Sequence, residues 1–532
     1  MRVASLVTCI LIASTSTGFA FTKPAVQKTT PEYKIQRVAG SKIMSNLANK
    51  TSEDKMPVVV TFNNMNGAKK FKKKCKRKYR HIPAIATEMT MAEVHETAKN
   101  PDVSQIDYDE QVKAMDDGSD YWYGTKKART DFGVSGDGDG NISSFTKEDN
   151  TIAVIDTGID ANHVDLQNKV IGWYDATYLA RTTPYDDNGH GTHVAGIAAG
   201  RGVGNANYIG VAPGASLVGI KVLSGSGGGS TSDVIEGIDW AIANKDKYGI
   251  KVINMSLGTD GSSDGRDATS LAVNRAVDAG IVCAVAAGNS GPNTKTVGSP
   301  GAADKALTVG AMADPSEGGF NLASFSSRGT TADGRIKPDI VAPGYKIMAA
   351  KANSGNGYVS LSGTSMATPF VAGVASLMLD ANSSLTPAQV QQKMEATAEN
   401  WGPSGKNVDY GSGNLKAYDA IKSAGGFSGV GPTLPQHIYK EGTISSWRGK
   451  QDYTFSFKAG QKVAITMIIP QWNIFMPDLD VYLLNSSGGT VAYSIGTKRQ
   501  ETITYTVPTT GVYTVSVRSY LGTGSYFFDL SA

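Results

Sequence analysis

Short apolar runs alternate with helical segments between residues 151 and 424, and this alternation constrains the fold more than any other feature of the sequence. Strands that are apolar on both sides are typical of a parallel sheet covered by helices on both faces. Ligands bind such sheets beyond the carboxyl ends of the strands. We therefore predict an α/β domain with its functional site at that edge and with strands at residues 151–155, 216–220, 252–255 and 281–286.

The chain is too long for one hydrophobic core, because its 532 residues exceed the roughly 250–300 at which single cores stop growing. A content of 40% hydrophobic and 19% charged residues excludes a disordered or membrane-embedded chain. Residues 57–110 alternate strand and helix patterns, which predicts a small α+β domain with a helix in the lysine-rich stretch 69–78. Beyond a hinge at residues 428–432, strand runs separated by turn signals predict a β-sandwich over residues 433–532.

The N-terminus has the pattern of a secretory signal peptide. Met1 and Arg2 precede a short apolar stretch and the small-residue sequence that ends at Ala20. A membrane anchor needs about 20 apolar residues, roughly twice the length of this stretch. We predict cleavage after Ala20, an extracellular protein, and no membrane span. Cys75 and Cys283 would lie on separate units, so no structural disulfide is expected.

Charge is distributed unevenly along the chain. Residues 21–115 hold 18 basic and 10 acidic side chains, whereas residues 116–532 hold 32 basic and 38 acidic ones. Opposite charge favours association of the two parts. The lysine-rich stretch also fits a nucleic-acid patch, but a secreted protein rarely meets nucleic acid and a solvated helix face explains the run equally well. We expect no nucleic-acid partner.

Three segments carry candidate chemistry. Asp156 ends the first apolar run, where a carboxylate is held rigidly. His190 opens a small-residue helical segment, and Ser365 lies just ahead of the helical run 370–379, where peptide N–H groups favour an anion. Serine is a poor nucleophile until a base takes its proton, histidine titrates near neutrality, and a carboxylate orients the imidazole.

In the order Asp, His, Ser, these segments resemble the motifs of the subtilisin (subtilase) family of serine endopeptidases, and the similarity extends through roughly residues 120–420. The resemblance implies a triad of Asp156, His190 and Ser365, with an oxyanion hole formed by Asn289 and the backbone N–H of Ser365. It also implies a substrate cleft built from Gly227, Gly228, Gly229, Ser256, Leu257, Gly258, Ala286, Ala287, Gly288 and Gly298.

The resemblance extends to specificity and processing. Gly288 and Gly298 would leave an open, apolar pocket, which implies broad cleavage after large apolar residues. Residues 57–110 resemble the family's inhibitory propeptide, which blocks the cleft and is removed autocatalytically, with cleavage after Met115. The C-terminal region resembles a pre-peptidase C-terminal domain. The expected units of this monomer are a signal peptide (1–20), a propeptide (21–115), a catalytic domain (116–425) and a sandwich (433–532).

Calcium is the expected cofactor, in a structural role. Asp137, Asp139, Asn141 and Glu148 stand at the first, third, fifth and twelfth positions of a calcium loop, although Ile142 stands where that loop has glycine. A simple acidic turn is the alternative. Asp165 resembles a calcium ligand of the family.

Other polar residues near these motifs fit structural roles. Asp160, His163 and His193 are interpreted as structural, and Cys283 as a packing residue. Two other functions remain open. One is a catalytically inactive scaffold that binds partners. The other is a secreted binding protein whose β-domain acts and whose protease domain only matures it.

Overall fold

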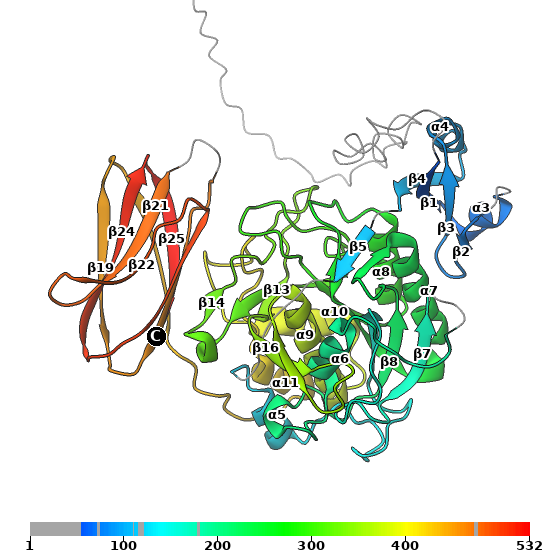
Figure 1. The fold of residues 1–532 in the computed structure, drawn as a ribbon, viewed down its shortest axis with the longest axis horizontal. Coiled ribbons are helices and arrows are strands. Elements are labelled where there is room, and N and C mark those ends of the chain that lie inside the picture. The colour runs from blue at the N-terminus through cyan, green and yellow to red at the C-terminus, as the bar shows by residue number, and fades with distance from the viewer. Residues whose placement is uncertain (1–54, 72–74, 110, 115–121, 178–180, 473–476) are drawn as a thin grey trace, which may run out of the picture.

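The structure is a computed structural model that describes residues 55–71, 75–109, 111–114, 122–177, 181–472 and 477–532. The predicted signal peptide and Met115 lie outside the described residues. A small N-terminal domain and a β-sandwich flank the central domain (Figure 1). No helix in the described part of the chain is both long and apolar enough to cross a membrane.

The central domain is built on an eight-stranded sheet in the order β14-β13-β12-β10-β6-β8-β7, with β15 also paired to β13. All of its strands are parallel except β14, which pairs antiparallel with β13. The strands are β6 (Thr151–Asp156), β7 (Val170–Asp175), β8 (Leu217–Lys221), β10 (Ile250–Met255), β12 (Val282–Ala286), β13 (Leu307–Ala313), β14 (Asn321–Leu322) and β15 (Ile340–Pro343).

Helices cover both faces of this sheet. Successive side chains of each strand point to opposite faces, so one strand contributes to two separate core clusters. Ile152 and Val154 pack in one core cluster, and Ala153 and Ile155 pack in the other. The first cluster lies under α6 (His190–Ala199), α9 (Thr364–Ala381), α10 (Pro387–Thr397) and α11 (Ala417–Gly425), and the second under α7 (Thr231–Tyr248) and α8 (Ala268–Asp278). The predicted parallel α/β architecture is confirmed.

In its described residues, the N-terminal domain is a four-stranded antiparallel sheet with two helices. Val59 on its open face belongs to the core cluster under α7 and α8, so this face packs on the central domain. Its elements are β1 (Met56–Phe62), α3 (Met65–Lys70), β2 (Arg77–Lys78), β3 (Ala84–Met89), α4 (Met91–Ala98) and β4 (Val103–Tyr108).

The helix predicted within residues 69–78 is wrong. Helix α3 already ends at Lys70, and Arg77–Lys78 is a strand paired with β3. Like charges three and four residues apart repel one another along a helix. In the strand, by contrast, Arg77 reaches an acidic partner on the central domain.

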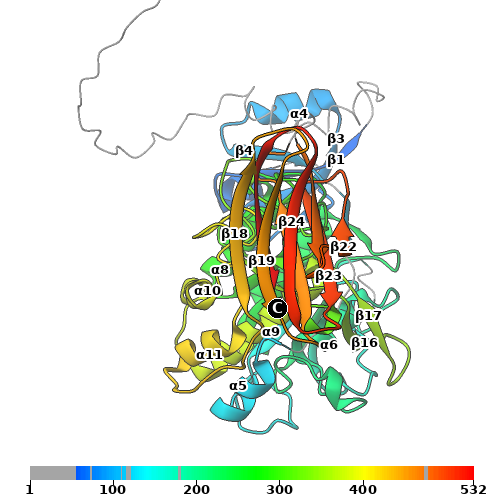
Figure 2. The same cartoon turned by 90° about the vertical axis from the view of Figure 1, so that its left-hand side faces the viewer.

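The C-terminal region is a sandwich of two four-stranded antiparallel sheets, as predicted. Figure 2 looks through it toward the central domain. One sheet holds β18 (His437–Ile444), β25 (Gly524–Ser531), β20 (Lys462–Ile468) and β23 (Gln500–Thr506), and the other β19 (Lys450–Phe457), β24 (Gly511–Leu521), β21 (Asp478–Leu484) and β22 (Thr490–Ser494). Ile468 and Phe527 of the first sheet belong to the core cluster of the central domain, so this sheet packs against it.

The remaining elements lie around the central domain. Helix α5 (Thr125–Phe132) packs on α11, and β16 (Ile347–Ala350) pairs with β17 (Tyr358–Leu361). A separate three-stranded sheet has β5 (Gln111–Ala114) between β9 (Gly228–Ser230) and β11 (Leu257–Gly258).

Candidate active site

The ends of two elements bring a carboxylate and an imidazole together. Asp156 is the last residue of β6, and His190 is the first residue of α6. The imidazole Nδ1 lies 2.7 Å from Asp156 Oδ1, which also accepts a 2.7 Å bond from the backbone N–H of Thr157. Both side chains are buried. The carboxylate therefore holds Nδ1 and directs Nε2 away from β6.

The close approach of α6 to β6 requires a glycine after the histidine. A Cβ on Gly191 would lie 2.1 Å from the carbonyl oxygen of Gly158. The backbone N–H of Gly191 donates to Thr157 Oγ1 at 2.9 Å. The small residues predicted to allow helix–sheet contact have this role here.

Ser365 is the second residue of α9, which begins six residues earlier than the helical run expected from the sequence. Pro369 lacks an N–H, so the Ser365 carbonyl has no donor four residues ahead. Ser256 supplies one instead, because its Oγ donates to that carbonyl at 2.7 Å. The Ser365 hydroxyl in turn donates to the Ser256 carbonyl at 3.1 Å. A rotation about the Ser365 Cα–Cβ bond would release this hydroxyl for proton transfer, and catalytic hydrogen bonds often form only with substrate present.

Two groups near the start of α9 could donate hydrogen bonds to a substrate. The Asn289 Oδ1 accepts from the N–H and the Oγ1 of Thr364, at 3.0 and 3.1 Å. The NH₂ group of this amide therefore points away from Thr364. The Ser365 N–H belongs to the first helical turn, where N–H groups have no intrahelical acceptor. Such a pair of donors can stabilise a developing oxyanion.

An extended segment lies between the two edges expected to bind substrate. Strand β5 pairs antiparallel with both neighbours, with Val112 opposite Gly229 and Ala114 opposite Leu257. Lys113 lies opposite both Gly228 and Gly258. The structure thus brings these cleft residues together around a peptide strand next to Ser256 and Ser365.

The glycines expected to open a specificity pocket are required by close contacts or by their backbone conformation. A Cβ on Gly298 would lie 2.0 Å from the carbonyl oxygen of Thr259. Gly288 has a φ of +107°, and a Cβ there would lie 2.8 Å from Ser327 Oγ. Gly227 has a φ of +78° in the turn before β9. Ala286 and Ala287 are buried within and just after β12.

The other polar residues of these segments have structural partners. Burial lowers the pKa of His193 to about 3, and its Nε2 lies 3.0 Å from the carbonyls of Ile347 and Val359. The His163 Nε2 lies 2.9 Å from the Gly357 carbonyl, and the Asp160 carboxylate accepts from backbone N–H groups. Burial raises the pKa of the Cys283 thiol, which keeps it protonated.

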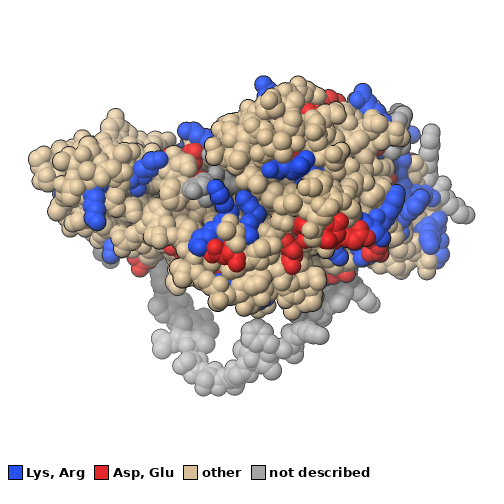
Figure 3. Space-filling model, turned by 90° about the horizontal axis from the view of Figure 1, so that it is seen from below, with Lys and Arg blue, Asp and Glu red and all other residues tan. Residues whose placement is uncertain are grey.

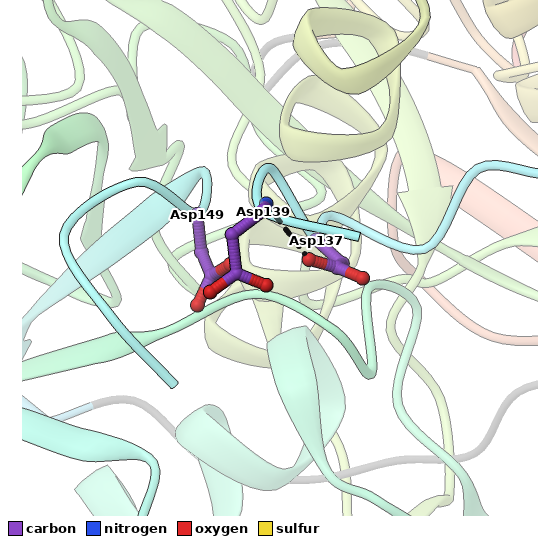
Figure 4. Close-up of side chains that lie close together, drawn as sticks. All are labelled: Asp137, Asp139 and Asp149. Carbon is purple, nitrogen blue, oxygen red and sulfur yellow. Dashed lines mark hydrogen bonds between the residues drawn. The ribbon is translucent and has the colours of Figure 1, made fainter. Parts of the chain in front are cut away.

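Three aspartates of one loop form the candidate metal site. Within the described residues, Asp137, Asp139 and Asp149 are the His, Cys, Asp or Glu side chains that could hold a metal together, with ligand atoms within 4.8 Å of one another (Figure 4). Asp149 was not predicted. Glu148 is instead exposed beside Lys147, and the Asn141 Oδ1 accepts from the Ser143 N–H.

Asp165 has protein donors on both oxygens. Its Oδ1 accepts from the Gly204 N–H at 3.1 Å and its Oδ2 from the Tyr358 hydroxyl at 2.8 Å. Asp165 lies outside the three-aspartate group. The Gly204 bond holds the neighbouring loop at 201–208, and the Tyr358 bond ties Asp165 to β17.

The N-terminal domain contacts the first half of α7 through an ion pair and through hydrogen bonds from backbone N–H groups to carboxylates. Arg77 pairs with Asp233 at 2.5 Å, and Asp109 Oδ1 accepts from the Ser232 N–H at 2.6 Å. The Asp239 carboxylate accepts from two N–H groups of residues 80–81, at 2.8 and 2.7 Å. Basic and acidic side chains lie side by side at this end of the molecule (Figure 3). The association expected from opposite charges is present as specific contacts.

Lys221, whose buried ammonium group lies next to the turn after Asp156, was not identified from the sequence. Lys221 Nζ donates to the carbonyls of Thr157 and Leu223, at 2.5 and 2.7 Å, and to Asp187 Oδ1 at 2.6 Å. It therefore joins the turn after Asp156, one edge of the cleft and the segment before His190. A lysine at the end of an apolar strand run was the available signal.

A buried Asp–His pair and a serine at a helix start lie near the carboxyl edge of a parallel sheet, an arrangement compatible with serine protease chemistry. The Subtilase family profile matches residues 147–413, and the profile of the Bacterial pre-peptidase C-terminal domain matches residues 449–519. The chain belongs to the subtilase family.

Curated relatives agree with this assignment. The chain is 37% identical over 377 residues to Serine protease AprX of Bacillus subtilis (strain 168), an alignment that covers 66% of this chain and 82% of AprX. It is 35% identical over 401 residues to Subtilisin E of the same strain, covering 73% and 96% of the two chains. The crystal structure of fervidolysin from Fervidobacterium pennivorans shares the fold at a TM-score of 0.55 and 21% identity, covering 84% of this chain and 69% of that one.

Proposed function

We propose that this subtilase is a secreted serine endopeptidase of broad specificity, with a preference for large apolar residues before the scissile bond. The observation that carries the proposal is the strand β5, which lies as an extended peptide between the cleft edges next to Ser365. Backbone pairing of this kind recognises extended chains with little dependence on their side chains.

In the proposed reaction, Ser365 Oγ attacks the scissile carbonyl while His190 Nε2 takes its proton. Asp156 holds the imidazole by the Nδ1 bond and stabilises its cation. The Asn289 amide and the Ser365 N–H bind the oxyanion of the tetrahedral intermediate. His190 then gives the proton to the leaving amine, and water releases the acyl group by the same steps.

We also propose that the protein is made as a zymogen. Residues 1–20 would be the signal peptide, 21–115 the propeptide, 116–425 the protease and 433–532 the sandwich. The contacts of Arg77 and Asp109 with α7 support an intramolecular inhibitor that holds β5 in the cleft. Cleavage after Met115 would end the covalent link and leave the propeptide bound until it is degraded.

We propose a structural calcium ion at Asp137, Asp139 and Asp149. Oxygen-rich sites of this kind suit calcium, and these residues fit one because Asp149 is fully buried among acidic neighbours. Burial, and then the charge of Asp139, raise the pKa of Asp149. A bound cation would offset this charge and hold the loop, without part in the chemistry at Ser365.

The test compares the full chain with Ser365→Ala. The parent should convert its precursor to the mature size and degrade casein and other unrelated proteins, whereas Ser365→Ala should fold as an unprocessed, inactive precursor. Ser404→Ala, an exposed serine of the same domain, is the matched control and should behave as the parent. Processing and hydrolysis by Ser365→Ala at parent levels would remove Ser365 from the mechanism, and action on a single target would favour the binding-protein alternative.

A further inference from the structure

A buried charge network joins the sandwich to the central domain. Arg499 immediately precedes β23, and its two terminal nitrogens lie 2.5 and 3.0 Å from the two carboxylate oxygens of Asp409. Asp409 also accepts from Arg328 at 3.1 Å. All three residues are at most 2% exposed. Burial raises the pKa of Asp409, but the two guanidinium groups outweigh this effect and hold it below its usual range.

This network reaches the segment that carries the oxyanion donor. Arg499 also donates to the carbonyl of Pro292, three residues after Asn289, at 3.1 Å. The Gln500 Oε1 accepts from Arg328 at 2.6 Å, and its Nε2 donates to the Leu322 carbonyl at 2.7 Å. Arg499 and Gln500 are consecutive residues of the sandwich. Arg499 thus binds the segment that holds Asn289 and Pro292, and Gln500 binds the neighbouring segment from Leu322 to Arg328.

Those two segments are hydrogen-bonded along their length. The Ser290 N–H donates to Ser327 Oγ at 3.1 Å, and the Gly291 N–H donates to the Phe325 carbonyl at 2.7 Å. The Ser327 N–H donates back to the Gly288 carbonyl at 2.8 Å. Arg328 closes the far end of this pairing with bonds to the carbonyls of residues 323 and 326. This pairing would allow movement at Pro292 or Arg328 to be transmitted to Asn289.

We propose that Arg499 of the C-terminal sandwich is a positioning residue for the oxyanion hole, acting through Pro292 and the Asp409–Arg328 pair. The sandwich is then a working part of the protease. Arginine suits this role because its planar fork binds both carboxylate oxygens and still presents a donor to Pro292. The inference rests on the proposed peptidase function, since it concerns the rate of that reaction.

The test measures kcat and KM for Arg499→Met in the mature full-length enzyme, with a tetrapeptide anilide that has Phe before the scissile bond. A displaced Asn289 should lower kcat about tenfold, part of the 10²–10³ that loss of one oxyanion donor costs, and leave KM within about twofold. Arg518→Met, on the other sheet of the sandwich, is the matched control and should match the parent. Arg499→Lys keeps the charge but lacks the fork, and it decides by the same thresholds if Arg499→Met does not fold.

A double variant separates positioning from general destabilisation. In an Asn289→Ala background, Arg499→Met should cause no further loss of kcat, because the donor that it positions is already gone. Unchanged kcat in the single variant, or equal losses in both backgrounds, would overturn the proposal. A parent enzyme with no peptidase activity would contradict the proposed function instead, so the two failures are distinguishable.

Discussion

Two histidines on one helix differ in chemistry because they face different groups. His190 has its Nδ1 against the Asp156 carboxylate, whereas His193 has its Nε2 against the carbonyls of Ile347 and Val359. A carboxylate stabilises an imidazolium, and a fully buried site without one disfavours it. The contact of His190 with Asp156 supports its proposed role as the proton acceptor. His193, by contrast, is a neutral donor that joins α6 to the β16–β17 hairpin.

The neutral state of His193 predicts a pH-dependent loss of stability. Burial lowers its pKa to about 3, below the ordinary value near 6.5, so unfolding takes up a proton as pH falls through that window. Its stabilising contribution is complete above pH 6.5 and is lost progressively toward pH 3. In a Ser365→Ala background, which is expected to prevent self-cleavage, His193→Gln should lower Tm at pH 7.5 but make the fall in Tm between pH 6.5 and pH 4 shallower.

The comparison of the two proteins at each pH cancels the contributions of all other titrating groups. Parallel plots of Tm against pH for the two proteins would show that folding does not lower the pKa of His193.

At the scale of elements, the loop of Asp137, Asp139 and Asp149 is expected to depend on calcium. Chelation with EGTA should lower the Tm of the parent by about 5 °C or more. An ion at a hundredfold excess over Kd contributes about 2.7 kcal/mol, and each kcal/mol shifts Tm by roughly 2–4 °C in a domain of this size. Calorimetry with and without calcium measures the shift.

Asp139→Asn should reduce this calcium-dependent shift, because it removes one ligand charge while leaving the buried Asp149 in place. Asp246→Asn, an exposed acid of α7 paired with Lys245, is the matched control and should retain the full shift. Equal melting temperatures of the parent with EGTA and with calcium would favour the acidic-turn interpretation of this loop.

Helix and strand boundaries that depend on neighbouring residues could be predicted from the sequence. Asp156 and His190 stand at the borders of apolar and small-residue runs, and the structure ends β6 and begins α6 at those residues. The start of α9 was missed because Pro369 suggests a helix boundary. The lost hydrogen bond is replaced by Ser256, which lies more than a hundred residues away.

Contacts between residues that lie far apart in the chain could not be predicted from the sequence. Asp409 and Arg499 are 90 residues apart in different domains, and neither lies in a recognisable motif. Asp149 was missed for another reason, since the spacing of a calcium loop favours Glu148. Which of two neighbouring acids points inward depends on its partners, here the Ser216 hydroxyl and the N–H groups of Gly138 and Thr146.

At the scale of the whole molecule, the sandwich is expected to stay with the mature enzyme. Besides the arginine network, His437 stacks on the buried Trp401 with ring centroids 4.1 Å apart, and Asp529 accepts from the Gly402 N–H at 2.9 Å. The linker between the domains is more accessible, and Val430 is 82% exposed. A nick there should leave two fragments that co-elute on size exclusion in native buffer with full activity.

Mass spectrometry of the eluted peak identifies both fragments, and denaturant should separate them. Elution of a free sandwich fragment apart from a fully active protease would show that the interface is weaker than these contacts imply.

The most direct test of the central claim is covalent labelling of the mature enzyme with an organophosphonate, which reacts with a serine activated by a neighbouring base. We expect one label per molecule, located by peptide mass spectrometry at Ser365, with activity lost in proportion to labelling and no labelling in His190→Ala. A label on another residue, or activity that survives complete labelling of Ser365, would contradict Asp156, His190 and Ser365 as the catalytic triad.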